Sequence, residues 1–117
     1  MANVESIVIS WLDSITDWAV SGDKPKSLPE KFILVDRTGG PREAMVLDRA
    51  EILIEVYHKN SRATASEKAN EIADLVPGLL AYSENITRAV VNSVVNLDDI
   101  IGKYSHYQIY CDVYYRR

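Results

Sequence analysis

Few residues of this sequence have the types and the spacing that catalysis requires. His58 and His106 stand at the end of one expected strand and at the start of another, and neither lies in a recognisable motif. An enzyme nucleophile needs a base within hydrogen-bond reach, itself held by a third group. The single cysteine, Cys111, follows the alternation of a buried strand face, which favours a small core side chain over a reactive thiol. We therefore expect no catalytic residues and no enzymatic activity.

Two short motifs that can hold ions or phosphates lack their usual surroundings. Asp98 and Asp99 offer paired carboxylates, which suit hard cations, but no further oxygen donors follow at calcium-loop spacing. Gly39 and Gly40 lead into a strand, whereas a phosphate loop opens a helix whose amides point at the anion. We predict neither a metal site nor a cofactor, and interpret the glycine pair as a hairpin turn.

A pair of carboxylates marks one face of an expected strand. Glu51 and Glu55 share that face, whereas Ile52, Ile54 and Val56 lie on the other. The like charges of the two glutamates would repel each other against an apolar wall. We therefore expect the face that carries Glu51 to meet water.

Tyrosines crowd the last expected strand and its approach. Alternation places Tyr107 and Tyr115 on the core face with Cys111, whereas Tyr110 and Tyr114 fall on the other face. Exposed tyrosine among polar neighbours is typical of a protein interface, because the ring buries area while the hydroxyl keeps a polar partner. We predict that Tyr110 and Tyr114 contact another subunit.

The first segment has the period of an amphipathic helix. Apolar residues recur at three- and four-residue spacings over 4–19, with Asn3 as a suitable N-cap and Gly22 as a suitable stop. Trp11 and Trp18 lie one heptad apart and give this helix more apolar area than a small helix needs. Two interpretations stay open for the tryptophans: packing on a sheet, or contact with another subunit.

The later segments alternate between strand and helix patterns. Turn residues separate two β-rich runs, and Thr64 with Glu67 forms a capping box that opens a second helix. The other expected segments are a connector at 22–31, strands at 32–37, 45–57, 86–97 and 106–115, and a loop at 98–103. In the strand at 86–97, the residues expected on the buried face are Ala89, Val91, Val95 and Leu97.

The order of these elements indicates the fold class. Helix, strand, strand, helix, strand, strand (α-β-β-α-β-β) favours an α+β domain, a mostly antiparallel four-stranded sheet with two main helices packed on one side. A chain of 117 residues is long enough to bury one core and too short for two. We expect a single domain over residues 1–117 with a flexible hairpin tip near 38–44.

Charge restricts the partners of such a domain. The chain carries 17 acidic against 13 basic side chains, a net charge of -4. This balance argues against a protein that grips nucleic acid by neutralising phosphates. The first residues lack a basic region ahead of an apolar stretch, and no apolar run reaches a membrane-spanning length, so we expect an intracellular protein without a membrane partner.

The layout resembles that of the tail terminator (tail completion) proteins of long-tailed, siphovirus-type double-stranded DNA phages. The resemblance covers nearly the whole chain: a leading helix with two tryptophans, a proline-bearing connector, an alanine-rich helix and an aromatic last strand ending at Arg117. Its most characteristic stretch is the run at 32–40, which ends in two glycines, with the strand at 48–56 that follows.

The resemblance implies a structural protein of the virion, located where tail and neck join and assembled in the host cytoplasm. Such proteins form a ring, usually of six subunits, at the head-proximal end of the tail tube. The ring ends tube polymerisation and joins the tail to the head connector or head-closure protein, and DNA passes through its lumen without specific binding.

A head-to-tail ring needs two complementary patches on each subunit. The candidates for subunit or tube contact are Trp11, Trp18, Thr38, Gly39, Gly40, Arg42, Tyr110 and Tyr114. Acidic side chains in the lumen would discourage sticking to phosphate. The candidates for this role are Glu51, Glu55 and Asp112.

Two other functions stay open. Another neck component, a head-closure or adaptor-ring protein, would share the size and the absence of catalysis but bind the portal side. A small α+β ligand-binding domain would have the same order of elements. It needs a concave pocket with converging polar groups, and the sequence shows no such cluster.

Overall fold

The computed structural model describes residues 3–39, 47–97 and 104–116. Its elements are α1 (Val4–Ile15), β1 (Ala19–Ser21), β2 (Lys31–Gly39), β3 (Leu47–His58), α2 (Arg62–Leu75), the short turn η1 (Val76–Gly78), α3 (Leu79–Tyr82), β4 (Ile86–Asn96) and β5 (Ser105–Arg116). Gly40, Arg42, residues 40–44 of the expected hairpin tip and the pair Asp98 and Asp99 lie outside the described residues.

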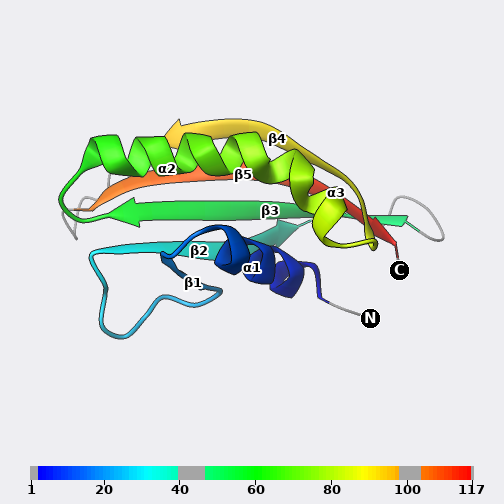
Figure 1. The fold of residues 1–117 in the computed structure, drawn as a ribbon, viewed down its shortest axis with the longest axis horizontal. Helices are drawn as coiled ribbons and strands as arrows, with labels where there is room; N and C mark the ends of the chain where they lie inside the picture. The colour runs from blue at the N-terminus through cyan, green and yellow to red at the C-terminus, as the bar shows by residue number, and fades with distance from the viewer. Residues whose placement is uncertain (1–2, 40–46, 98–103, 117) are drawn as a thin grey trace.

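The strands form one five-stranded sheet in the order β1-β2-β3-β5-β4 (Figure 1). β1 pairs with β2 in parallel, and every other pair is antiparallel. The α+β class and the two main helices are confirmed, whereas the expectation of a four-stranded, mostly antiparallel sheet is wrong. The sheet is mixed, and the order of elements includes β1. α2 carries the chain from β3 to the far edge, where β4 forms, and β5 then returns into the gap between them.

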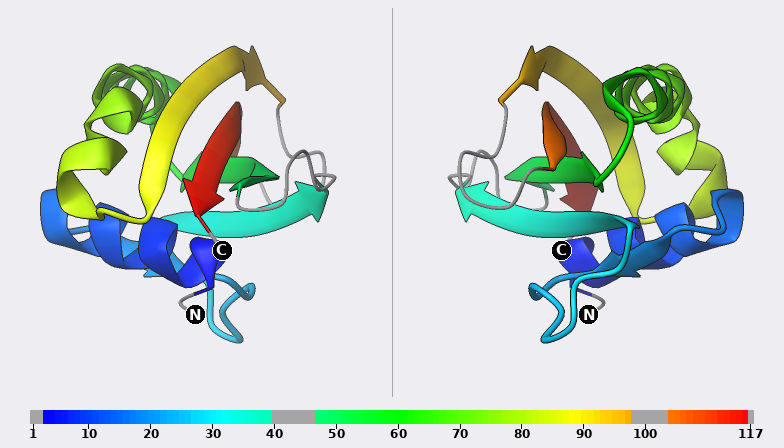
Figure 2. Two further views of the ribbon diagram at one scale, coloured as in Figure 1. Left: turned by 90° about the vertical axis from the view of Figure 1, so that its right-hand side faces the viewer. Right: turned by 90° about the vertical axis from the view of Figure 1, so that its left-hand side faces the viewer.

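Both main helices lie on the same side of the sheet, as the sequence predicts (Figure 2). They cover alternate residues of the strands, and one apolar core results. Ala65 and Ala69 of α2 are fully buried, and their small side chains let the helix lie close to the sheet. Each large aliphatic side chain buried in this layer contributes roughly 2 kcal/mol of transfer free energy. They include Leu12, Ile33, Ile52, Ile54, Ile72 and Ile109.

The first helix ends earlier than its apolar period predicts. α1 stops at Ile15, where Thr16 is the C-cap, so Gly22 is not its stop. Residues 19–21 instead pair with β2, because strand pairing satisfies their backbone groups and outweighs the helical spacing of their side chains. Asn3 is confirmed as the N-cap, since its side chain accepts two backbone N–H groups of the first turn.

β4 changes its alternation along its length. Thr87 and Asn92 each stand as an extra residue where the pairing with β5 shifts register. An extra residue moves the side chains that follow it to the other face. The expectation that Val95 and Leu97 are buried is therefore wrong, since they are 40% and 50% exposed. Ala89, between the two shifts, is confirmed as buried.

The second helix begins at Arg62, with Ser61 as its cap. The Ser61 hydroxyl oxygen accepts the N–H of Thr64 at 3.0 Å, so the predicted cap, Thr64, lies inside the first turn. Nδ1 of His58 accepts the N–H groups of Asn60 at 3.2 Å and Ser61 at 3.1 Å. These two bonds fix the chain that leads from β3 into the cap.

Removing this cap should weaken the protein. We expect Ser61→Ala to lower the free energy of unfolding by about 1 kcal/mol, because the N–H of Thr64 loses its acceptor. Chemical denaturation of the wild-type protein and the variant measures the difference. Thr64→Ala is the matched control and should change stability by less than about 0.5 kcal/mol. A greater loss in the control than in Ser61→Ala would contradict the assignment of the cap.

Candidate functional site

The side of the sheet that the helices leave open holds five of the predicted site residues. Residues directly opposite each other in paired strands share a face. The alternation predicted for β5 is confirmed, because Ile109, Cys111, Val113 and Tyr115 are buried in the core. Glu51 lies opposite Asp112 in β3 and β5. The open side, called the helix-free face below, carries Glu51, Glu55, Tyr110, Asp112 and Tyr114.

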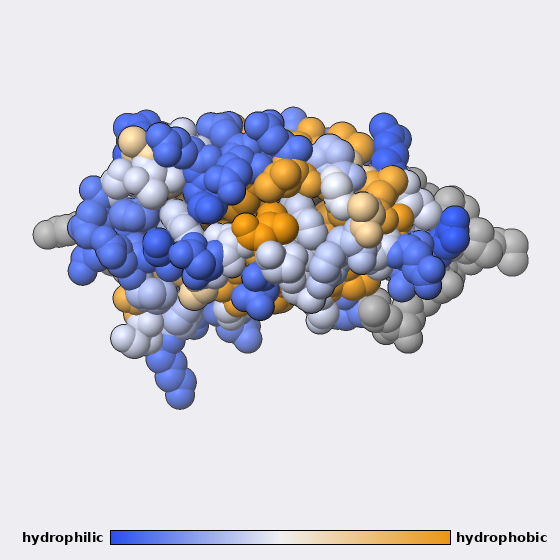
Figure 3. All heavy atoms as spheres, in the orientation of Figure 1, coloured by the Kyte–Doolittle hydropathy of each residue, from blue (hydrophilic) through white to orange (hydrophobic). Residues whose placement is uncertain are grey.

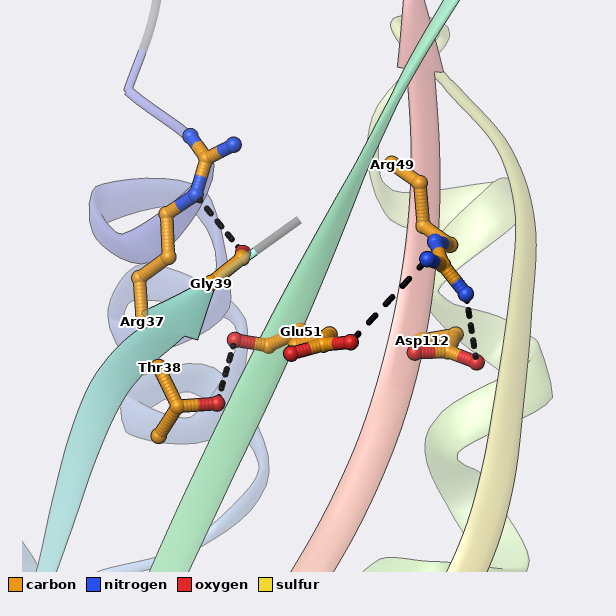
Figure 4. Close-up of polar contacts among 6 residues, drawn as sticks. All are labelled: Arg37, Thr38, Gly39, Arg49, Glu51 and Asp112. Carbon is orange, nitrogen blue, oxygen red and sulfur yellow. Dashed lines mark hydrogen bonds and ion pairs between the residues drawn. The ribbon is translucent and has the colours of Figure 1, made fainter. Parts of the chain in front are cut away.

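Arg49 lies between two carboxylates of the helix-free face (Figure 4). Its Nη2 is 4.0 Å from Oε1 of Glu51, and its Nη1 is 3.8 Å from Oδ2 of Asp112. One guanidinium shared by two carboxylates offsets their mutual repulsion and leaves the cluster with a net negative charge. Arg49 is not among the residues predicted for a site, although strand alternation places it on the same face as Glu51 and is the signal that identifies it.

Thr38 and Gly39 adjoin this cluster at the end of β2. The hydroxyl of Thr38 donates to the carbonyl of Glu51 at 3.3 Å, and Nε of Arg37 donates to the carbonyl of Gly39 at 3.2 Å (Figure 4). A Cβ on Gly39 would lie 2.9 Å from Oε2 of Glu51, so the glycine leaves room for this carboxylate. β2 runs to Gly39, so residues 38 and 39 of the expected hairpin tip are strand.

Glu55 is held in a polar network and is not a freely exposed carboxylate. Its Oε1 accepts from Nε2 of Gln108 at 3.2 Å and lies 3.7 Å from Nε2 of His106. Its Oε2 accepts from the hydroxyl of Tyr57 at 3.5 Å. The network continues to Tyr110, whose hydroxyl donates to Oε1 of Gln108 at 2.7 Å. These contacts fix the orientation of the polar side chains between β3 and β5.

Aromatic rings bury one end of the helix-free face. Phe32 stacks on Tyr57 with ring centroids 4.6 Å apart, and Tyr57 stacks on His106 at 4.0 Å. Tyr104 meets Phe32 edge-on, and its hydroxyl donates to the carbonyl of Pro29 at 2.8 Å. The expectation that this face meets water is therefore wrong at this end of the face. It is also wrong for Leu53, which lies between the two glutamates and is 9% exposed, whereas the side chain of Glu51 is 47% exposed.

A hollow of about 320 Å³ opens beside the Arg49 cluster. Its lining comes from four strands: Thr38, Glu51, Ile52, Asn92, Tyr110, Cys111 and Asp112. These polar groups do not converge in the sequence pattern, because the extra residue Asn92 in β4 depends on strand pairing that the sequence does not display. The volume is at the small end of the range for ligand sites, which are also mostly apolar.

The predicted interface residues divide between core and surface. Trp11 and Trp18 are only 4% and 5% exposed and belong to the core, so packing within one chain accounts for their apolar area. Tyr114 is half-buried, and the guanidinium carbon of Arg88 lies 5.6 Å from its ring centroid. Tyr110 is 37% exposed. Among the aromatic candidates, Tyr110 offers the most surface to a partner.

The helix-covered face has a different character (Figure 3). Hydrophilic side chains gather over α2, and apolar ones appear toward α3. Leu75, Leu80 and Tyr82 are 43%, 44% and 43% exposed in this region. The two sides of the sheet therefore suit neighbours of different chemistry.

Two structural features were sought in residues 3–39, 47–97 and 104–116, a cluster of metal-ligating side chains and a membrane-spanning helix. No three His, Cys, Asp or Glu side chains of these ranges are placed to hold a metal ion. No helix within them is long and apolar enough to cross a membrane.

Cys111 contributes to the wall of the hollow from the core side. Its side chain lies opposite Ile52 in β3 and Val91 in β4, and it is 3% exposed. Burial, and then the charge of Asp112, raises the pKa of the thiol from 9.0 to about 12. Because the thiolate is the reactive form, this environment keeps Cys111 inert.

The folded protein should protect Cys111 from alkylation. At pH 8 we expect iodoacetamide to modify the native thiol at least about 100-fold more slowly than the urea-unfolded chain, because the raised pKa lowers the thiolate fraction. Mass spectrometry measures the alkylation rates of the native and the unfolded chain, and equal rates would contradict the burial of Cys111.

The raised pKa of Cys111 also makes the free energy of unfolding depend on pH. Its stabilising contribution is complete below pH 9 and is lost as the pH rises toward 12.

Comparison with known proteins gives a likeness of fold. No family model and no curated protein sequence matches the chain. Among solved structures, 24 chains match. One of them belongs to the virion of a native gene transfer agent particle and aligns with a TM-score of 0.68 and 13% sequence identity. The alignment covers 100% of this chain and 87% of that chain, so the two share a fold over the whole length described here.

Proposed function

We propose that this chain is a structural virion protein that forms a ring at the head-proximal end of a phage tail tube. The ring ends tube polymerisation and joins the tail to the head. Its partners are other copies of the chain, six to a ring as in the family it resembles, together with the tail tube protein and the head connector or head-closure protein. DNA passes through the lumen without specific binding, and the chain performs no catalysis.

The shared fold is the observation that carries this proposal. The neighbour in the gene transfer agent virion is part of an assembled particle, and it matches the entire chain. The layout of the sequence, considered by itself, resembles tail terminator proteins. Fold and sequence layout therefore favour the same class of structural component.

The helix-free face suits the lumen of such a ring. Glu51 has a side chain that is 47% exposed, whereas those of Asp112 and Glu55 are 18% and 20% exposed. Arg49 offsets only part of the charge of its two carboxylate neighbours. Glu51 is thus the carboxylate best placed to repel DNA phosphates, and the other two add to the field.

A head-closure or adaptor-ring protein is the alternative within the same particle. It would have the same kind of subunit but bind on the portal side. A ligand-binding domain is the alternative from another class, favoured by the hollow beside Arg49. We rank it lower because the groups that converge there are mainly polar and the volume is small.

Tails assembled without the protein should be abnormally long. If the ring stops tube growth, its removal leaves polymerisation unchecked, and adding back the wild-type chain should restore uniform length. Electron microscopy of both preparations measures the length distribution. Tails of normal length that fail to join heads would favour the head-closure alternative. Tails that are normal in both respects would contradict any neck function.

Reversing the charge of Glu51 should make the ring retain DNA. We expect assembled Glu51→Lys rings to bind duplex DNA more tightly than wild-type rings and to lose that binding as salt rises, because a cation in the lumen contacts phosphates. Glu67→Lys, an exposed site on α2, makes the same charge change on the helix-covered side and is the matched control. Fluorescence anisotropy across a salt series measures both. Equal binding by the two variants would contradict the lumen assignment.

A further inference from the structure

Among the strands that the structure describes, β4 has one side without a partner. β4 is an edge strand, and within the described residues no strand pairs with its outer side (Figure 1). The segment at 92–97, called the β4 end below, reads Asn-Ser-Val-Val-Asn-Leu and contains no charge and no proline. Proteins that stay monomeric commonly blunt such edges with lysine, proline or a covering element. The β4 end has neither of these residues.

Backbone and side chains of the β4 end are both open to a further strand. The N–H of Leu97 donates to the carbonyl of His106 at 2.7 Å, and the alternation of antiparallel pairing then directs the backbone groups of Val94 and Asn96 outward. Val94 is 37% exposed on the helix-covered side. Val95 and Leu97 are exposed on the helix-free side. Apolar side chains thus flank the open edge on both faces.

β1 is the opposite edge, and its direction complements that of β4. β1, β2 and β5 run one way through the sheet, whereas β3 and β4 run the other way. If sheets continue from copy to copy with the helices on the same side, β4 of one copy meets β1 of the next in antiparallel orientation. Two different edges in contact make a heterologous interface, which is the kind that closes rings.

We propose that the β4 end pairs with β1 of a second copy of this chain, so that one sheet continues from subunit to subunit. The inference rests on the ring of the proposed function, since a self-paired β4 edge would give a two-fold dimer. Ala19 lies opposite Phe32, on the helix-free side, and is exposed. In the continuous sheet, Ala19 of one copy therefore shares a face with Val95 of its neighbour.

Introduced cysteines test which edges meet. Ala19→Cys combined with Val95→Cys places two reactive thiols on the helix-free side of opposite edges, while the native Cys111 stays buried. With a short bis-maleimide, we expect the double variant to form a ladder of covalent multimers on denaturing gels and each single variant to stay monomeric. Dimers from Val95→Cys alone would show that β4 pairs with itself. That result, or a monomeric double variant, would overturn the proposal.

A proline at the outward-facing position tests the backbone pairing itself. Val94→Pro removes one outward N–H and leaves the pairing with β5 intact, whereas Val94→Thr keeps the N–H and is the matched control. We expect Val94→Pro to abolish the multimers without lowering the thermal midpoint by more than the control does. Rings formed equally by both variants would overturn the strand pairing and leave the proposed function standing. Cross-linked multimers together with normal tails in the absence of the protein would overturn the proposed function alone.

Discussion

The uninterrupted pairing of β3 with β5 is the contact on which the rest of the structure depends. Its register runs without a shift from Leu47 opposite Arg116 to His58 opposite Ser105. Because opposite residues share a face, this one alignment places the isoleucines of β3 in the core and Glu51 on the other side. A slip of one residue would turn the carboxylates of β3 toward the helices. The free-energy cost of burying these unpaired charges would exceed any gain from apolar packing.

The same alternation explains how much of the fold and the site can be predicted from the sequence. The alternation of side chains around Glu51 and Asp112 is strict enough to assign both faces of β3 and β5. It therefore predicts that acidic and aromatic residues lie together on one face of the sheet. The extra residue Asn92 does not follow, because it depends on pairing with β5 and nothing in the surrounding valines marks it. The three residues of β1 are too few to show a period. The choice of Ser61 over Thr64 as cap depends on how His58 fixes the incoming chain.

The candidate site owes its character to incomplete compensation of charge. Arg49 pairs with two carboxylates at once, while Glu55 contacts the side chains of Gln108, Tyr57 and His106. The result is a surface whose polar side chains are held in place and whose remaining charge is negative. The helix-covered side is apolar near α3, so one subunit presents two chemically distinct surfaces. The tryptophans contribute to neither, because the core of the single chain uses their area.

β5 is the last of the five strands along the chain, yet it lies between two strands that precede it. During synthesis, β3 and β4 are therefore complete before the strand that joins them has been made. Until then, the core lacks the buried side chains of β5. Contacts between segments so distant in sequence form late and slowly. A nascent or truncated chain without β5 consequently has no continuous sheet, and only a finished copy displays the complete helix-free face.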